Sequence, residues 1–365
     1  MVDGTVYCEH LIPAKTVFGI PIVLIHGEFH TGSIWLKTAD NRPGWANYFL
    51  SQGYSVYIIH IPPTRQSSGM LSQVENVIRP NIELIENEAT SLANSATADW
   101  GTAKLHNQWP GTGRCGDLIF DQYIARLTPL CFEPPERQLL AQRAVASLIQ
   151  MTGPAILIGE GTGANTAWLV ADYKPEQVRA VLAIEPSGPP FCLPYEDDED
   201  NKRRYTPFLR HVPGLRRYGL ADIPMNFDPP TVINDIKDLE DPTWSPLNVS
   251  QVMRKDGPGS YYSQQADGIV GLHNGDSLQA REGQESIGDK PVRKLPCLQR
   301  MAHAVITTEC SPHSLYDWAT VKFLQETGTQ VEHIELAKQG IHGNGPLCFL
   351  EKNSNQVAAV LHNWI

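Results

Sequence analysis

The sequence predicts an α/β protein with a mostly parallel, twisted sheet, helices on both faces and an inserted cap. Short β-branched runs alternate with longer segments whose apolar residues recur at helical spacing, with short links between them. This alternation occurs in both terminal parts of the chain, whereas residues 187–296 are rich in proline and charged residues. One α/β core interrupted by an insertion accounts for both patterns.

The first half of the core begins with a strand, a helix and a second strand. The apolar run 19–27 ends at a glycine and predicts a buried strand. Residues 43–54 have helical spacing and a glycine stop, and 55–63 form a strand that two prolines end. Residues 64–133 are less regular. They contain a helical segment within 74–90 and an aromatic, turn-rich stretch.

From residue 135 onward the regular pattern returns, breaks at the insertion and resumes near the C-terminus. The expected core therefore has two parts, 1–186 and 297–365, with 187–296 as a cap or lid between them. The remaining expected elements are helices over 135–150, 162–173, 314–328 and 354–365 and strands over 154–160, 178–186, 302–309 and 331–337.

Composition and charge narrow the classes of partner. The net charge of −11 argues against binding to nucleic acid or to an anionic membrane. No run of about 18 apolar residues predicts a membrane span, and the N-terminus shows no signal-peptide pattern. The seven cysteines are scattered and no His/Cys cluster has metal spacing, so we expect reduced thiols, a cytoplasmic location, and no metal or other cofactor.

The stretch ILIGEGTGAN (156–165) has the pattern of a strand, a tight glycine turn and a helix start. In a nucleophile elbow such a turn lifts the hydroxyl of its middle residue above the sheet. The residue at that position is Gly161, which has no side chain to act as a nucleophile.

Several stretches together resemble the α/β-hydrolase fold, and within it an esterase-like family described as novel bacterial esterases, with fungal relatives. The resemblance implies that fold, a serine at position 161 and a histidine at position 346, where this chain has Gly161 and Pro346. The matching stretches are IPIVLIHGEFHTGSIW, RPGWANYFLSQGYSVY, WPGTGRCGD, IEPSGPPF, YGLADIPMNFDPP, SPHSLYD and GIHGNGPLCFLEKN.

The two departures exclude acyl-enzyme catalysis by this pair, because losing the nucleophile and base costs serine hydrolases on the order of 10⁶-fold in rate. Three neighbours are candidate substitutes. Thr162 is expected to cap the helix rather than act as a nucleophile. Cys348 is expected to pack into the approach to the last helix, and Glu160 to hydrogen-bond near the site rather than serve as a base.

Two residues are predicted to carry the remaining proton chemistry. Glu185 ends the strand after the elbow, where a carboxylate can reach the site, and Glu309 is the alternative acid one strand later. Whether Glu185 acts in catalysis or only hydrogen-bonds the loop backbone stays open. His342 lies in the late glycine-rich loop, and the resemblance implies that it stands beside the family's catalytic histidine, so it is the candidate for proton transfer.

An oxyanion hole and a pocket are also expected. The backbone N–H groups near Glu28 and of Thr162 are the expected donors, although a carboxylate at position 28 would oppose negative charge unless protonated, turned outward or used as an acid. Three of the expected pocket residues also have a non-catalytic alternative. In it, His26 bonds only to nearby backbone, His30 is exposed to solvent, and Trp35 packs in the core. The expected pocket residues are His26, His30, Trp35, Glu160, Gly161 and Pro346.

These observations lead to three functional hypotheses. The first is a cofactor-free enzyme of secondary-metabolite biosynthesis that has left hydrolysis, a pseudo-hydrolase acting as an isomerase, lyase or cyclase on a small hydrophobic molecule. Isomerisation, elimination, condensation and cyclisation are the reactions considered. The second is a catalytically silent protein that binds such a molecule, and the third is a hydrolase with a relocated nucleophile. A homodimer is left open.

Overall fold

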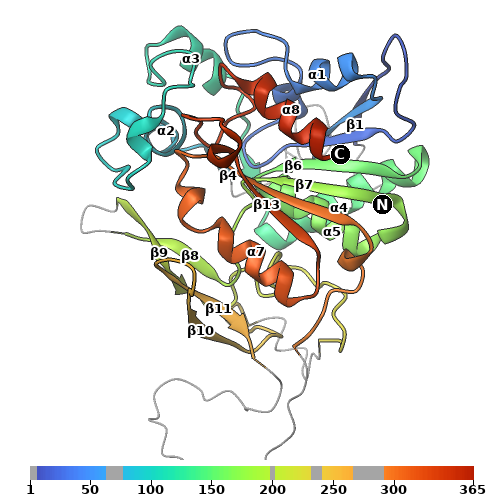
Figure 1. Cartoon of the computed structure of the whole chain (residues 1–365), viewed down its shortest axis with the longest axis vertical. Helices are drawn as coiled ribbons and strands as arrows, with labels where there is room; N and C mark the ends of the chain where they lie inside the picture. Colours follow the sequence, from blue (N-terminus) through green and yellow to red (C-terminus); the bar gives the residue numbers. More distant parts are fainter. Residues whose placement is uncertain (1–5, 63–76, 198–201, 232–240, 266–291) are drawn as a thin grey trace, which may run out of the picture.

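The computed structural model describes residues 6–62, 77–197, 202–231, 241–265 and 292–365. It has the α/β architecture that the sequence predicts, with one main sheet between two layers of helices (Figure 1). No helix of these residues is long and apolar enough to cross a membrane.

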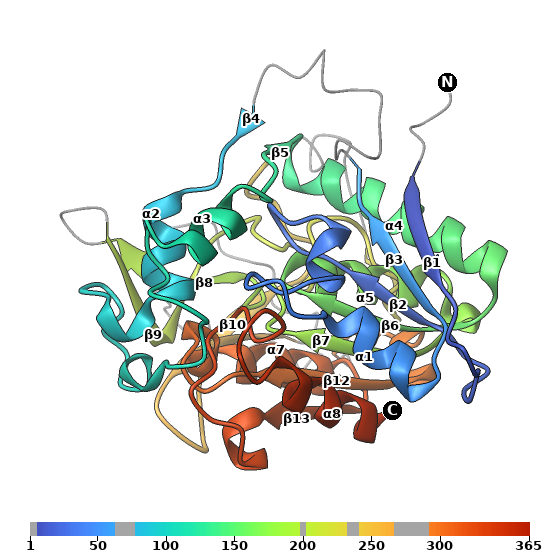
Figure 2. The ribbon, with the colours of Figure 1, turned by 90° about the horizontal axis from the view of Figure 1, so that it is seen from above.

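The main sheet contains seven strands in the described part of the chain, and Figure 2 lets their order be followed from β1 to β13. Every neighbouring pair is parallel except the edge pair of β1 and β3. In spatial order the strands are β1 (Tyr7–Leu11), β3 (Val56–His60), β2 (Ile22–Ile25), β6 (Ala155–Glu160), β7 (Val178–Ile184), β12 (Ala302–Thr307) and β13 (Val331–Glu335).

Two apolar cores lie on the two faces of this sheet, because successive side chains of a strand point to opposite faces. In β2, Val23 and Ile25 join the core under α4, α5 and α7, and Ile22 and Leu24 join the core under α1 and α8. Figure 1 shows these two groups of helices on opposite sides of the sheet. The main helices are α1 (Trp45–Gln52), α3 (Leu118–Ile124), α4 (Pro134–Thr152), α5 (Thr162–Tyr173), α7 (Asp317–Glu326) and α8 (Ser354–Trp364).

A second sheet, in the order β10-β11-β9-β8, comes from the expected cap and lies below the main sheet in Figure 1. Its four strands are formed by described residues, while 198–201, 232–240 and 266–291 of that stretch lie outside them. The domain boundaries themselves stay a prediction. The strands are β8 (Cys192–Asp197), β9 (Arg203–His211), β10 (Val249–Met253) and β11 (Ser260–Gln264).

The helical segment expected within 74–90 is confirmed only in part, and its first residues lie outside the described part. The strand β4 (Val77–Ile78) pairs with β5 (Leu130–Cys131), and helix α2 (Ile82–Ile85) begins after Pro80 and continues as a π-helical turn. Proline disfavours helical backbone in the residue before it, so the helix starts only after this point. The Asn81 side chain then caps it by accepting from the Leu84 N–H at 3.1 Å.

Candidate functional site

The turn between β6 and α5 has the shape of a nucleophile elbow and carries a glycine at its tip. Gly161 has φ 53° and ψ −122°, in the left-handed region that favours glycine. The Gly161 N–H donates to the Ile184 carbonyl at 3.0 Å, and the Gly161 carbonyl accepts from the Ser187 N–H at 3.2 Å. A Cβ on Gly161 would meet no described heavy atom within 4 Å outside its immediate neighbours. The turn therefore has room for a nucleophile but supplies none.

A buried hydrogen-bonded chain ties the elbow to the loop after β2. Glu160 Oε1 accepts from the Gly27 N–H and lies 2.7 Å from His30 Nδ1, and His30 Nε2 lies 2.9 Å from the Tyr123 hydroxyl. Burial would raise the pKa of Glu160, but His30 and the Gly27 N–H outweigh it and lower this pKa below its ordinary value. Glu160 thus hydrogen-bonds beside the elbow, as expected.

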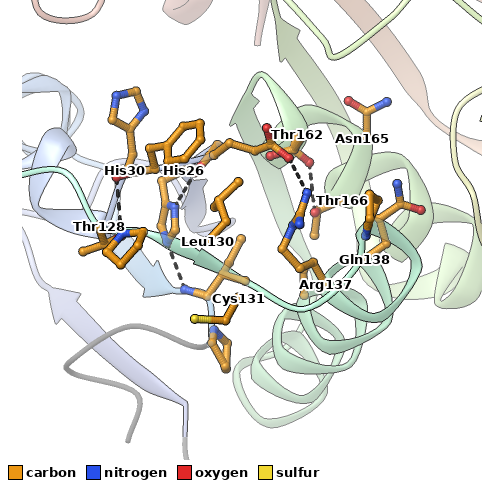
Figure 3. Close-up of a pocket in the computed structure, with 18 residues that line it drawn as sticks. His26, His30, Thr128, Leu130, Cys131, Arg137, Gln138, Thr162, Asn165 and Thr166 are labelled. Atoms are coloured by element: carbon orange, nitrogen blue, oxygen red, sulfur yellow. Dashed lines mark hydrogen bonds and ion pairs between the residues drawn. The ribbon is translucent and has the colours of Figure 1, made fainter. Parts of the chain in front are cut away.

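The two residues expected to supply oxyanion donors, Glu28 and Thr162, line the same pocket. Glu28 Oε1 accepts from the Arg137 guanidinium at 2.7 Å, and the same guanidinium donates to the Phe132 carbonyl at 2.7 Å. The carboxylate is therefore paired with a cation within the pocket wall. In Figure 3, Arg137 and Gln138 come from α4, while Thr162 and Thr166 come from α5.

The expectation that Thr162 caps its helix is wrong. The N-cap of α5 is Gly161, with no side-chain capping bond, and Thr162 is the first helical residue. Its carbonyl accepts from the Thr166 hydroxyl at 3.0 Å, and no base is bonded to its own hydroxyl within the described residues. The backbone N–H at position 162 is one of the first-turn donors that have no partner inside a helix.

The other expected pocket residues divide into two groups. His26 and His30 line the pocket and are both buried. The alternative in which His30 is exposed to solvent is therefore wrong. Burial lowers the pKa of His26 to about 4, and its ring is bonded to the Gly27 carbonyl and the Ile61 N–H, which matches its backbone-bonding alternative. Trp35 was predicted in the pocket, which is wrong, because it is fully buried against Trp45 and Phe349 in the core. Glu160, Gly161 and Pro346 are not among the residues that line this pocket.

Glu185 is buried at the end of β7, and the loop after β12 binds both of its oxygens. Oε1 accepts from the N–H and the hydroxyl of Thr308 at 2.9 and 2.5 Å, and Oε2 accepts from the Ser311 hydroxyl at 2.7 Å. Burial and the charge of Asp317 raise the pKa of Glu185, although His313 opposes them. One of these bonds is to the loop backbone, as in the non-catalytic alternative for Glu185, and the other two are to side-chain hydroxyls of the same loop.

His342 is not brought to Glu185. Its side chain is 62% exposed, and Nδ1 lies 3.1 Å from Glu309 Oε1. The Gly343 N–H donates to the other oxygen of Glu309 at 2.8 Å, which fixes the loop with the imidazole outward. The predicted catalytic pair of Glu185 and His342 is therefore not assembled. Glu309, the alternative acid, serves as the partner of this surface histidine instead.

His313 and Asp317, which are not among the site residues expected from the sequence, form a hydrogen-bonded pair within electrostatic range of Glu185 and Glu160. His313 Nδ1 is 2.8 Å from Asp317 Oδ1, and the other oxygen of Asp317 accepts from the Thr307 hydroxyl at 2.7 Å. Burial lowers the pKa of His313, but the charges of Asp317, Glu185 and Glu160 outweigh it and raise this pKa above its ordinary value. The imidazole is thus within electrostatic range of both carboxylates that flank the turn.

The signal for this pair was present in the stretch SPHSLYD. A histidine and an aspartate four residues apart lie on one side of a helical turn. Here His313 precedes α7 and Asp317 is its first residue, in the segment that follows the end of β12 at Thr307. The carboxyl end of a parallel strand is where functional side chains of α/β sheets gather. That combination would have pointed to His313.

Neither Pro346 nor Cys348 of the late glycine-rich loop supplies a base. Pro346 is half-buried, and the Cys348 thiol is fully buried with its pKa raised by burial and by the charges of Glu185, Glu351 and Glu160. A thiol held in its protonated form is a poor nucleophile, so Cys348 packs, as expected. Among the described residues, no three His, Cys, Asp or Glu side chains are arranged to hold a metal ion.

Comparisons with known proteins place these features in context. No family model matches the chain. It is 30% identical over 361 residues to a protein named probable secreted lipase phiG from Fungal sp. (strain ATCC 74256), which covers 99% of this chain and 85% of that protein. A solved structure described as a novel bacterial esterase is similar with a TM-score of 0.54 and 15% identity, over 98% of this chain and 84% of that one. The structural likeness shows the α/β-hydrolase fold.

These names correct two expectations. The prediction of a pseudo-hydrolase acting as an isomerase, lyase or cyclase is contradicted, because the relative is named a lipase and the similar structure an esterase. The predicted cytoplasmic location is contradicted by the word secreted in the relative's name.

Proposed function

Because the chain belongs to the same family as the probable secreted lipase phiG, we propose that it hydrolyses carboxylic esters with water as the nucleophile. One observation carries the proposal. The elbow keeps its left-handed turn at Gly161, with room above it, and a carboxylate-bound imidazole, His313, lies within electrostatic range of Glu160 and Glu185 on either side of that turn.

The proposed reaction uses water where a serine hydroxyl would otherwise stand. His313 Nε2 takes a proton from the water as its oxygen attacks the ester carbonyl carbon, while Asp317 holds Nδ1 and stabilises the imidazolium. The backbone N–H groups of Glu28 and Thr162 stabilise the negative charge on the carbonyl oxygen. The bond to the alkoxy oxygen then breaks, and His313 returns the proton to the leaving alkoxide. The products are an acid and an alcohol.

Known magnitudes make this mechanism adequate but slower than acyl-enzyme catalysis. A positioned general base contributes about 10²–10⁴-fold, and each oxyanion donor about 10²–10³-fold. Serine hydrolases without their triad keep a rate enhancement of only about 10³–10⁴-fold over the reaction in water. In the proposed mechanism, His313 supplies most of the rate enhancement above that residual value. We therefore expect turnover that is low for an esterase.

A relocated nucleophile is the competing mechanism, and the contacts favour it less. Thr162 has its hydroxyl at the pocket wall, but no described base is bonded to it. The Cys348 thiol is buried and surrounded by carboxylates that oppose its ionisation. Neither group has the hydrogen-bonded base that an activated nucleophile requires.

A covalent probe distinguishes water attack from a side-chain nucleophile. During turnover of p-nitrophenyl butyrate, we expect a fluorophosphonate probe to leave the mass of the protein unchanged, because Gly161 has no hydroxyl to phosphonylate. Mass spectrometry of the intact protein gives the readout. The matched control is Gly161→Ser, which places a hydroxyl at the tip of the same turn and should acquire the mass of the probe. Labelling of the unaltered protein at Thr162, with loss of turnover, would instead support a relocated nucleophile.

The pH dependence of hydrolysis tests the proposed base. His313 must be neutral to accept a proton, and its pKa is raised above the ordinary value of 6.5. We therefore expect kcat/KM to rise with pH through a midpoint above that value and to fall as the imidazole is protonated at lower pH. Replacing Asp317 with Asn removes the largest charge that raises this pKa, so the midpoint should move to lower pH. A midpoint that does not respond to this substitution contradicts the assignment.

A further inference from the structure

The pocket beside the elbow has an apolar interior and a single charged pair in its wall. It borders the loop after β2, the start of α5 and the first turns of α4. A concave, mostly apolar site with a few polar groups is typical of small-molecule binding. The apolar side chains that line it are Phe29, Ile61, Pro62, Pro129, Leu130, Cys131, Pro134 and Ala141.

Most of the uncharged polar groups that line the pocket are already bonded within the protein; the exceptions among the described residues are Asn165 Oδ1, an acceptor, and the Thr162 hydroxyl. Gln138 donates to the Asp222 carboxylate and accepts from the Asp222 N–H, both at 2.8 Å. The hydroxyls of Thr128 and Thr166 donate to backbone carbonyls. His26 is bonded through both ring nitrogens to backbone, and burial lowers its pKa to about 4, which keeps it neutral. These groups leave little capacity to bind a charged ligand.

Among the described residues that line the pocket, Arg137 is the one Lys or Arg, and its charge is already paired. One arm donates to Glu28 and the other to the Phe132 carbonyl, so the guanidinium is fixed at two points. The side chain is 17% exposed, and that of Glu28 is 38% exposed. A second carboxylate entering the pocket would meet Glu28 at the same guanidinium and be repelled by it.

We propose that this pocket binds the uncharged, apolar acyl chain of the ester, and that the Glu28–Arg137 pair excludes acyl chains that end in a carboxylate. This inference rests on the proposed hydrolysis and assigns its substrate class. Arg137 also has a second role in this proposal. By pairing with the Glu28 carboxylate, it reduces the repulsion between that carboxylate and the developing oxyanion.

Two esters of equal length test the proposal. p-Nitrophenyl hexanoate and the mono-p-nitrophenyl ester of adipic acid differ only in a terminal methyl or carboxylate. We expect the unaltered protein to favour the hexanoate in kcat/KM by about tenfold or more, since a carboxylate without a charged partner is costly to bury.

Glu28→Gln is the decisive variant, because it leaves the guanidinium without its carboxylate. It should shift the ratio toward the adipate ester by about tenfold, the size expected for a hydrogen bond to a charged group. Arg137→Gln should lower kcat/KM for both esters by leaving Glu28 unpaired near the oxyanion donors. The control is Arg143→Gln, an exposed arginine of the same helix, which should not change the ratio. A ratio unchanged by Glu28→Gln overturns the proposal.

A binding measurement separates this inference from the proposed hydrolysis. Hexanamide and adipamic acid are amides of the same two acyl chains, and their effects on the thermal unfolding midpoint report binding without turnover. The unaltered protein should be stabilised more by hexanamide, and Glu28→Gln more by adipamic acid. If no ester is hydrolysed but this reversal occurs, the pocket assignment stands and the reaction fails. If esters are hydrolysed and the reversal is absent, only the pocket assignment fails.

Discussion

Replacing His313 with alanine lowers kcat/KM for p-nitrophenyl hexanoate by about 10²–10⁴-fold, the usual contribution of a positioned general base. The reason lies in the contacts of the imidazole. Asp317 binds Nδ1 at 2.8 Å, so Nε2 is the nitrogen that accepts the proton, and the charges of Glu185 and Glu160 act on the same ring. We expect the loss mainly in kcat, because the ring acts on the attacking water rather than on the acyl chain. Steady-state kinetics measure it.

Two further measurements separate a lost base from a damaged fold. His313 is largely buried, so its removal can also lower stability, and the urea unfolding midpoint of each variant is needed. Added imidazole should restore part of the activity of His313→Ala, which a misfolded protein would not allow. His211→Gln is the control, since that histidine stacks on Tyr262 in the second sheet. A folded His313→Ala variant with unchanged kcat/KM would falsify the proposed mechanism.

The core of the fold could be predicted because its strands are buried on both faces. In β2 and β6 almost every residue is apolar, which produces continuous runs that glycine or proline ends. The edge strand β1 gave no such signal. Its residues are half-buried or exposed and include Glu9 and His10, and it is held by pairing with β3, about 50 residues away in sequence.

The site could be predicted where its geometry is local and not where it depends on distant partners. The elbow at Gly161 follows from the glycine spacing around one turn. The outward direction of His342 depends on Glu309, which lies on another loop. Trp35 was misassigned because an aromatic residue in a loop has the same pattern whether it packs in a core or lines a pocket. The spacing of His313 and Asp317 is a local signal, but the charges of Glu185 and Glu160 that act on the imidazole come from other elements and depend on the fold.

The functional error came from treating the loss of a nucleophile as the loss of a reaction. A glycine at the elbow excludes an acyl-enzyme at that position, and this conclusion is unchanged by the structure. It does not exclude attack by water, which needs a base, oxyanion donors and space. From the sequence, the base was expected in the late loop, at position 346 or His342. In the structure, His313, which follows β12, has its imidazole bound to a carboxylate.

The second large effect is expected on stability, at the buried side chain that anchors the late loop. Glu351 has no exposed surface and accepts from His106 Nε2 at 2.7 Å, from the Gly345 N–H at 3.0 Å and from the Asn344 amide at 2.6 Å. Replacing Glu351 with alanine leaves the buried His106 ring and the Gly345 N–H without this acceptor, while the Asn344 amide keeps only Asn353 Oδ1. We expect the free energy of unfolding to fall by about 3–5 kcal/mol, as when one partner of a buried polar pair is removed. Urea unfolding followed by circular dichroism measures it.

A glutamate on the protein surface, Glu176, provides the control for this stability measurement. Glu176 is paired with Arg300, but its side chain is 77% exposed, so Glu176→Ala should change the free energy of unfolding by no more than about 1 kcal/mol. The loop that Glu351 anchors also carries Cys348, which lies within electrostatic range of Glu185 and Glu160. Loosening it should therefore lower ester hydrolysis as well as stability. If Glu351→Ala were as stable as Glu176→Ala, the loop would be held by its apolar packing, and the elbow would not depend on this hydrogen-bonded cluster.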